Sequence, residues 1–227
     1  MKIAIIPARG GSKRIKNKNI KNFLGKPIIS YSINIAKKSK LFEKIIVSSD
    51  SRKIIKIAKK YGAETPFVRP KDLARSNSST IDVIKHSIRW LLKNKIKPKY
   101  ICCIYPTSPL MEKNDLKNSF KIVKKKKNDF VVAVSQYSYP VRKSFYIKNN
   151  RIKTVKSSNY FTLSQNLKTA FHDAGQFYWG STKTWLKKKN IINENSYVFK
   201  LPQLKVQDID NINDWKIAEK LFILKKK

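Results

Sequence analysis

The feature that most constrains the fold is an alternation between short apolar runs and longer segments with one apolar face. Residues 3–7 are apolar throughout, which is typical of a strand covered on both faces. Similar runs follow at 44–50, 100–105 and 130–135, each separated from the next by at least one helix-length segment. Strands that alternate with helices pair in parallel, so the pattern predicts an α/β fold with a mostly parallel sheet and helices on both faces.

The helix-length segments can be placed from their periodicity and their capping residues. A helix is expected to begin near Pro27 and to place Ile28, Tyr31, Ile35 and Ala36 on one face. Gly62 is suited to end a second helix, and the run 76–80 is rich in residues that begin one. The remaining predictions are helices at 51–60, 81–92, 114–127, 181–188 and 213–224, and short strands at 65–68 and 177–179.

The alternation loosens after residue 135. The pair Asn149-Asn150 lies between the stretches 145–147 and 151–155, an arrangement that predicts a β-hairpin. A length of 227 residues suits one ordinary domain. We therefore expect a single domain over 1–227, with the region 136–170 forming a small projecting β element.

Composition limits the possible partners. The chain has 51 Lys and Arg against 14 Asp and Glu, a formal net charge of +37, which could indicate a nucleic-acid-binding module. However, Lys, Asn and Ile, all spelled by A/T-rich codons, are abundant together, and the lysines are spread along predicted helices apart from 124–127 and 225–227. Most aromatic residues also fall in predicted strands and helices rather than among surface cations. We expect no nucleic-acid partner, although the charge favours polyanionic substrates.

Cellular location and redox state follow from what the chain contains. No run reaches the roughly 18 apolar residues that a membrane span needs, and the apolar run at 3–7 is shorter than the core of a signal peptide. The two cysteines, Cys102 and Cys103, are adjacent in an apolar run and cannot readily bridge to each other. We expect a cytoplasmic protein, with no membrane contact and both cysteines reduced in a buried strand.

The clearest chemical signal lies where the first strand ends. Gly10-Gly11 follows directly, and Ser12, Lys13 and Arg14 come next. Two glycines allow left-handed backbone angles that turn successive N–H groups toward an anion. Arg9 and Lys13 can neutralise phosphate oxygens. The spacing fits neither a Walker A loop nor a dinucleotide-binding fingerprint, so these residues alone also allow a tight turn with surface cations.

The whole string decides between those two interpretations. Pro7–Lys13, followed by Lys18-Asn19, resembles the signature of the sugar-acid cytidylyltransferases, the CMP-sialic acid synthetase family. Segments similar to the family's recur in order along nearly the whole chain: 45–50, 69–74 with Ser78-Ser79-Thr80, the Pro-Thr-Ser-Pro-Leu turn at 106–110, and Asp208-Ile209-Asp210.

The resemblance implies a Rossmann-like nucleotidyltransferase fold whose projecting β element, around 136–170, joins two copies into a homodimer. It implies Mg²⁺ as cofactor, CTP as donor, and pyrophosphate release. Metal binding falls to Asp208 and Asp210, and the catalytic set would be those two residues with Arg9 and Lys13. The nucleotide would be bound by Ala8, Arg9, Gly10, Gly11, Ser12, Lys13, Asn19, Arg69 and Thr80.

Elementary geometry supports the metal assignment separately. An extended Asp-Ile-Asp segment places both carboxylates on one face and the isoleucine on the other. Mg²⁺ is commonly held by one or two carboxylates together with substrate phosphates. Without the resemblance, the same pair could simply lead into a helix cap at Asn213.

Two places depart from the sialic acid pattern and bear on the acceptor. Tyr105 stands where sialic acid synthetases resemble one another in having glutamine, and the segment 172–179 looks like that of pseudaminic acid cytidylyltransferases. A sugar pocket is therefore expected from Tyr105, His172, Asp173, Gln176 and Tyr178, which offer donors and acceptors to a polyhydroxylated acid. The expected reaction joins the anomeric hydroxyl of a nonulosonic acid to the α-phosphorus of CTP. Pseudaminic acid is the favoured acceptor, with sialic, legionaminic and keto-deoxyoctulosonic acids as alternatives.

Overall fold

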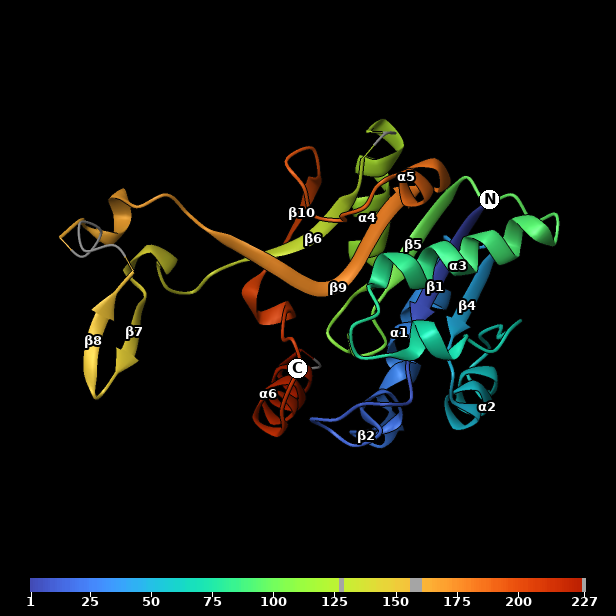
Figure 1. The fold of residues 1–227 in the computed structure, drawn as a ribbon, viewed down its shortest axis with the longest axis horizontal. Helices are drawn as coiled ribbons and strands as arrows, with labels where there is room; N and C mark the ends of the chain where they lie inside the picture. The colour runs from blue at the N-terminus through green and yellow to red at the C-terminus, as the bar shows by residue number, and fades with distance from the viewer. Residues whose placement is uncertain (127–128, 156–160, 226–227) are drawn as a thin grey trace.

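The computed structural model describes residues 1–126, 129–155 and 161–225. Its centre is a six-stranded sheet in the order β10-β6-β9-β5-β1-β4 (Figure 1). The strand β9 runs antiparallel to both of its neighbours, whereas the other pairings are parallel. The strands are β1 (Lys2–Pro7), β4 (Lys44–Ser48), β5 (Tyr100–Ile104), β6 (Val131–Gln136), β9 (Phe171–Ser181) and β10 (Tyr197–Leu201).

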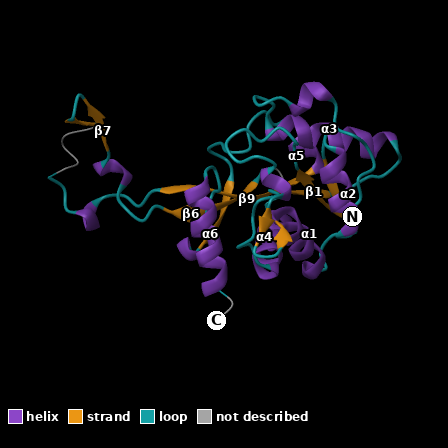
Figure 2. Cartoon of the chain, turned by 90° about the horizontal axis from the view of Figure 1, so that it is seen from below, coloured by secondary structure: helices purple, strands orange, loops and turns teal. Residues whose placement is uncertain are grey.

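Helices cover both faces of this sheet, as the sequence predicts (Figure 2). Side chains of α1 (Ile28–Ser39), α2 (Arg52–Lys60) and α4 (Lys113–Lys125) pack on one face. Those of α3 (Thr80–Lys93) and α5 (Thr182–Lys187) pack on the other, and α6 (Ile212–Leu224) packs with residues 15–28 in a third cluster. Among the described residues, no helix is both long and apolar enough to cross a membrane.

The first apolar run does not alternate between apolar and polar residues because both faces of β1 are buried. Ala4 and Ile6 of β1 belong to one hydrophobic cluster, and Ile3 and Ile5 belong to the other. The two cysteines follow the same rule, because Cys102 and Cys103 are fully buried on opposite faces of β5 and both are free thiols. Burial raises the pKa of both thiols, so they stay protonated and inert.

Several sequence predictions need correction. Residues 65–68 do not form a strand, since Pro66 offers no backbone donor; Val68 makes an isolated bridge to Ser49, directly after β4, and the preceding residue Glu64 makes one to Ile46 of β4. The buried face of α1 centres on Ile29 and Ile33, and Tyr31 and Ile35 are only partly buried. The edge strand β10 was not predicted, because its residues are mostly exposed and lack a clear alternation. The predicted helix end at residue 127 lies outside the described residues.

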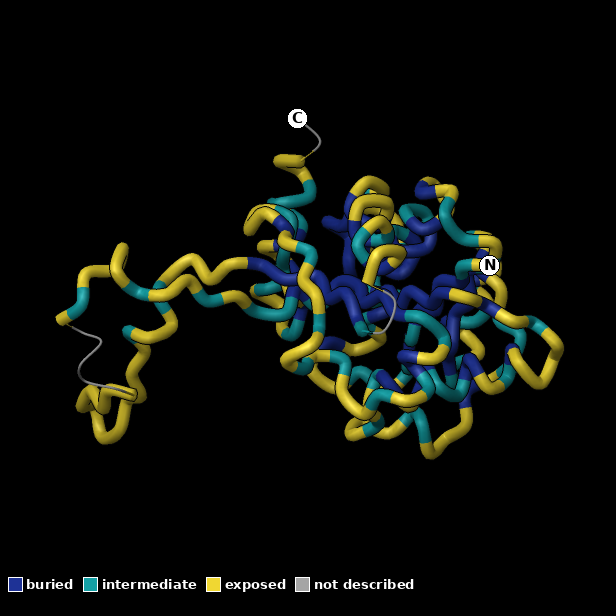
Figure 3. The backbone as a smooth tube through the Cα atoms, turned by 90° about the horizontal axis from the view of Figure 1, so that it is seen from above, coloured by how far each residue is buried: buried dark blue, intermediate teal, exposed yellow. Residues whose placement is uncertain are grey.

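The predicted hairpin is present and extends away from the sheet (Figures 1 and 3). It consists of β7 (Phe145–Lys148) and β8 (Arg151–Thr154). Asn149 and Asn150 have φ values of 51° and 57°, as a two-residue type I′ turn requires. Both strands are exposed along their whole length, so the hairpin has no core of its own. Residues 156–160 of the expected β element lie outside the described residues.

Short elements complete the chain between the main ones. A two-stranded ribbon joins β2 (Asn22–Phe23) to β3 (Lys26–Pro27). The single-turn 3₁₀ helices are η1 (Lys18–Ile20), η2 (Lys71–Ala74), η3 (Val141–Lys143), η5 (Ser164–Asn166) and η6 (Gln203–Lys205). Of these, η1 and η2 matter most, because they flank the cavity described below.

Candidate active site

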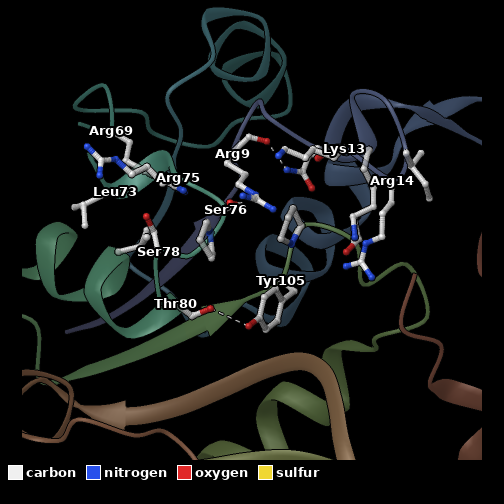
Figure 4. Close-up of a pocket in the computed structure, with 18 of the residues that line it drawn as sticks. Arg9, Lys13, Arg14, Arg69, Leu73, Arg75, Ser76, Ser78, Thr80 and Tyr105 are labelled. Carbon is white, nitrogen blue, oxygen red and sulfur yellow. Dashed lines mark hydrogen bonds between the residues drawn. The ribbon is translucent and has the colours of Figure 1, made fainter. Parts of the chain in front are cut away.

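A cavity of about 240 Å³ opens at the carboxyl ends of β1 and β5, where ligands bind in open α/β sheets (Figure 4). Its wall is strongly cationic, with a single acidic residue, Asp210, among the lining side chains. Arg69 and Arg75 lie at one side, Lys13 and Arg14 at the other, and Arg9 between them (Figure 4). The six basic residues in the wall are Arg9, Lys13, Arg14, Lys18, Arg69 and Arg75.

Close packing explains the glycine at the start of the loop after β1. The N–H of Gly10 donates to Oδ1 of Asp50 at 2.9 Å, and a Cβ on Gly10 would lie only 3.0 Å from Cβ of Ser51. Gly11 has open space around it. Neither glycine has a positive φ, so the expectation of left-handed angles is wrong. The loop approaches α2 closely, and that approach is what requires Gly10.

A buried amide fixes the path of the same loop. The side chain of Asn19, on η1, donates to the carbonyl oxygen of Arg9 at 2.9 Å. Ala8 is fully buried, and its N–H donates to the carbonyl of Ser48 at 2.9 Å. Six of the nine predicted nucleotide residues line the cavity, namely Arg9, Ser12, Lys13, Asn19, Arg69 and Thr80, whereas Ala8, Gly10 and Gly11 shape the loop behind it.

Arg69 is the most unusual cation of the cavity, since only 4% of it is exposed. Its guanidinium donates to the side chain of Ser48 at 3.1 Å and to that residue's carbonyl oxygen. Burial lowers the pKa of Arg69 to about 10, the carboxylate of Asp50 opposes this effect, and the nearby charge of Arg9 adds to it. At neutral pH the guanidinium is therefore a desolvated cation, and no carboxylate among the described residues lies within 4 Å of it.

Sequence reasoning missed Arg75 and Ser76, which follow η2 and reach the same cavity. The family-like segments end at Ala74 and resume at Ser78, so nothing in their pattern marked the residues between. Their position directly between two segments assigned to the nucleotide was the available signal.

A second cavity, of about 340 Å³, shares Thr80 and Tyr105 with the first. These two side chains are hydrogen bonded, with Oγ1 of Thr80 2.9 Å from the phenol oxygen of Tyr105, as the dashed line in Figure 4 marks. The rings of Tyr105 and Tyr178 meet edge to face at 5.6 Å between centroids. The two cavities are therefore neighbours separated by one hydrogen-bonded wall.

The polar groups of the second cavity are bonded to one another. The hydroxyl of Tyr178 donates to Oδ2 of Asp173, and the other carboxylate oxygen accepts the N–H of Gly175 at 2.9 Å. Burial raises the pKa of Tyr105 to about 12, and burial together with the charge of Tyr105 raises that of Tyr178 further. Both phenols thus stay protonated and able to donate. Ser79, Ile81 and the loop 189–192 complete the lining, and sequence reasoning did not assign any of them to the sugar pocket.

Two predicted sugar residues lie outside both cavities. Nδ1 of His172 is 2.8 Å from the carbonyl oxygen of Asp173, and its ring lies beside that of Tyr137. Gln176 is 3% exposed, and its amide donates to the carbonyl of Lys205. Its other amide atom, Oε1, is buried and has no hydrogen-bond partner among the residues that the structure describes. Direct contact of either residue with a sugar stays a prediction.

In the Asp-Ile-Asp segment the isoleucine is buried, as expected, but only Asp210 of the two carboxylates lines the first cavity. Ile209 is fully buried in the third hydrophobic cluster, and Asp210 faces the first cavity. Oδ1 of Asp210 is 2.7 Å from Nη2 of Arg14 and 3.7 Å from Nζ of Lys18. Asp208 lies against Gly175, so the segment touches the strand that carries Asp173. Partial desolvation by the surrounding protein and the negative charge of Asp210 raise the pKa of Asp208, and the positive charge of Lys18 opposes this rise.

This donor set fits Mg²⁺ supplied with a nucleotide. The described residues contain no group of three or more His, Cys, Asp or Glu that could hold a metal alone. The charge of Asp210 disfavours ionisation of Asp208, and a divalent cation, completed by phosphate oxygens and water, would offset that repulsion.

Comparison with known proteins agrees with this geometry. The family model described as cytidylyltransferase matches residues 3–218. The chain is 42% identical over 221 residues to the pseudaminic acid cytidylyltransferase of Campylobacter jejuni, covering 97% of this chain and 95% of that protein. It is 29% identical over 219 residues to the N-acylneuraminate cytidylyltransferase of Escherichia coli, covering 95% and 51%.

Among solved structures, CMP:2-keto-3-deoxy-manno-octonic acid synthetase complexed with CTP superposes with a TM-score of 0.71, and the match covers 99% of each chain. At 12% identity this likeness shows the fold alone.

Proposed function

This chain belongs to the cytidylyltransferase family, and we propose that pseudaminic acid is the nonulosonic acid to which it transfers CMP from CTP. The family and the relatives establish a CTP-dependent transferase that acts on a nonulosonic acid, as the sequence motifs predict. The choice of pseudaminic acid is supported by the higher identity to the pseudaminic enzyme than to the N-acylneuraminate enzyme, and by Tyr105.

The pair of adjoining cavities carries the proposal. A transferase that joins two substrates must hold the donor phosphate and the acceptor hydroxyl within bonding reach. The cationic cavity suits a triphosphate, and the neighbouring cavity suits a polyhydroxylated acid because it offers protonated phenols and a fixed carboxylate. The hydrogen-bonded pair Thr80–Tyr105 lines both cavities, so the reacting atoms would meet beside this pair.

In the proposed mechanism, the oxygen of the anomeric hydroxyl attacks the α-phosphorus, its proton passes to solvent, and the bond to the departing pyrophosphate breaks. Arg9, Lys13 and Arg69 neutralise negative charge as it moves onto the leaving phosphates. The Tyr178–Asp173 pair orients the acceptor. Positioning and charge neutralisation supply the rate, and no protein nucleophile is required.

Asp208 and Asp210 would hold Mg²⁺ in this proposal. The cation would withdraw charge from the α-phosphate and lower the pKa of the attacking hydroxyl. The support from this structure is Asp210 in the wall of the cationic cavity, with Asp208 near enough for the charge of Asp210 to raise its pKa. The cytoplasm is the compartment that supplies CTP, and we place the enzyme there.

A second copy of this chain is the proposed partner of the hairpin. Ile147 and Ile152 pair across β7 and β8 and are 73% and 66% exposed. An unpartnered apolar pair of this kind is suited to burial against a copy of itself. Ile147→Asp should reduce the mass in solution to that of one chain in light scattering. Lys148→Asp, beside the turn, should leave the mass unchanged; equal masses for Ile147→Asp and the unmodified protein would reject this dimer.

Thermal unfolding with nucleotides tests the donor assignment. CTP with Mg²⁺ should raise the melting temperature far more than ATP or GTP with Mg²⁺, because ligands that bind only the folded state stabilise it. Equal stabilisation by all three nucleotides would contradict selective use of CTP.

A further inference from the structure

Arg14 and Lys18 are the two cations of the nucleotide cavity that lie within 4 Å of its lining acid, Asp210, and Arg14 makes the shorter contact. Its Nη2 lies 2.7 Å from Oδ1 of Asp210. Arg9, Lys13 and Arg75 have no carboxylate within 4 Å among the residues that the structure describes. Arg14 therefore occupies a carboxylate that the proposed function assigns to a divalent cation.

We propose that Arg14 exchanges partners during the reaction cycle: it binds Asp210 while the cavity is empty, and it binds the triphosphate once a divalent cation takes Asp210. The inference rests on the proposed function. It adds that metal binding and phosphate binding are coupled through a single side chain.

The ion pair is suited to being broken. The side chain of Arg14 is 69% exposed and that of Asp210 is 40% exposed. Water screens such pairs, and their contribution corresponds to at most about a fivefold bias in an equilibrium constant. A divalent cation that binds the carboxylate of Asp210 therefore has only a weak ion pair to displace.

Lys18 provides the contrast that identifies Arg14 as the moving group. Its ammonium donates to the carbonyl oxygen of Ile209 at 2.6 Å and lies 3.7 Å from Asp210. Only 22% of its side chain is exposed. Lys18 is thus anchored to the backbone of the segment itself, whereas the carboxylate of Asp210 is the only polar partner of the Arg14 side chain within the described part of the chain, and Arg14 can leave it.

The released side chain would have a nearby destination. Arg14 lines the same cavity as Lys13, and the two lie on the same side of it in Figure 4. A divalent cation on Asp210 repels the guanidinium, and a triphosphate in the cavity attracts it. Guanidinium groups bind phosphate oxygens through paired N–H donors, so Arg14 can make a strong contact there.

A purely structural clamp would behave in the opposite way. If Arg14 served only to hold Asp210 in place, its removal would loosen the carboxylate, and metal affinity would fall. Under the exchange, its removal frees the carboxylate, and metal affinity rises. The sign of the change separates the two roles.

The first experiment titrates Mn²⁺ into the full chain without nucleotide and follows free Mn²⁺ by electron paramagnetic resonance. Arg14→Gln should bind Mn²⁺ about two- to fivefold more tightly than the unmodified protein, the size set by an exposed ion pair. Lys16→Gln is the matched control, because Lys16 has the same charge, is exposed and does not line the cavity. It should change the affinity less. Unchanged or weaker Mn²⁺ binding by Arg14→Gln would overturn the exchange.

The second experiment measures CTP binding by calorimetry, without acceptor, in EDTA and in Mg²⁺. Arg14→Gln should weaken CTP binding by about three- to tenfold in Mg²⁺ and by less than about twofold in EDTA, where Arg14 stays on Asp210. An equal loss in both conditions would make Arg14 an ordinary phosphate ligand and reject the exchange. If the unmodified protein bound no CTP, the proposed function itself would fail, and this result is distinct from either variant outcome.

Discussion

The two cavities differ in how their polar groups are held before any substrate arrives. In the nucleotide cavity, Arg9, Lys13 and Arg75 have no carboxylate within 4 Å among the described residues. In the neighbouring cavity, Tyr178 and Asp173 are already bonded to each other, and Tyr105 is bonded to Thr80. The nucleotide cavity thus contains three cations without a nearby carboxylate, whereas these polar side chains of the neighbouring cavity are already hydrogen bonded to one another.

The difference follows from what each substrate offers. A triphosphate has high charge and flexible oxygens, so several cations bind it tightly without exact placement. Stereoisomeric sugar acids carry similar groups that point in different directions, and only fixed partners can tell them apart. We infer that the cationic cavity supplies affinity and rate, and that the tyrosine network supplies acceptor selectivity.

The largest loss of turnover is expected at the proposed metal ligands, Asp208 and Asp210. Asp210→Asn should lower kcat by roughly 10³-fold or more, since a bound metal supplies several kcal/mol of charge stabilisation. Asp208→Asn should have a lesser or equal effect. Mg²⁺-dependent pyrophosphate release is the measurement, and unchanged thermal unfolding is the control for the fold. Near-normal turnover by both variants would remove the metal from this segment.

The next largest effect is expected in the cationic cavity. Lys13→Ala should reduce kcat/KM by roughly 10²–10³-fold, the size for losing one preorganised charge at a phosphoryl centre. Lys16→Ala, three residues along the chain and outside the cavity, is the matched control and should lose little. A loss of less than a few-fold for Lys13→Ala would show that the cations do not act on the reacting phosphates.

A smaller and more selective effect is expected in the tyrosine network. Tyr178→Phe removes the donor to Asp173 and should lower kcat/KM for the acceptor by roughly ten- to a hundredfold, the cost of an unsatisfied buried polar group. KM for CTP should stay within about twofold. Tyr100→Phe removes a phenol from the opposite face of the sheet and is the control. Equal losses of kcat/KM for CTP and for the acceptor would contradict the inference that the second cavity alone provides acceptor selectivity.

The smallest effect is expected at the shared wall. Thr80→Val removes the hydroxyl that bonds to Tyr105 and should raise both KM values by up to about fivefold, the worth of one hydrogen bond. Initial-rate kinetics with each substrate varied in turn would measure this. A change confined to one substrate would mean that the wall belongs to that cavity alone.

The two cavities also differ in how well sequence could predict them. The loop from Arg9 to Lys13 is local, so its residue order, together with the family resemblance of the string around it, predicted a phosphate site. Its geometry was less predictable: Gly10 is required by contact with Ser51, a residue that follows a different strand. Contacts of this kind depend on which strands become neighbours, and periodicity does not report that.

The second cavity is assembled from segments far apart in the chain. Tyr105, Asp173 and Tyr178 were predicted through resemblance to a family, and the structure brings them together. His172 comes from the same segment but faces elsewhere because it alternates with Asp173 along β9. Gln176 lies within the irregular part of the pairing of β9 with β6, where the regular alternation of side chains is broken. The loop 189–192 has no chemical signature, and its part in the wall emerges only from the fold.

The central claim concerns the acceptor, and direct competition tests it. Pyrophosphate release would be measured with saturating CTP and Mg²⁺, with pseudaminic acid and N-acetylneuraminic acid supplied separately and then together. Two or three mismatched polar contacts at about 1–3 kcal/mol each should favour pseudaminic acid by orders of magnitude in kcat/KM. Equal or better use of N-acetylneuraminic acid would contradict the account of the tyrosine network and leave the cytidylyltransferase assignment standing.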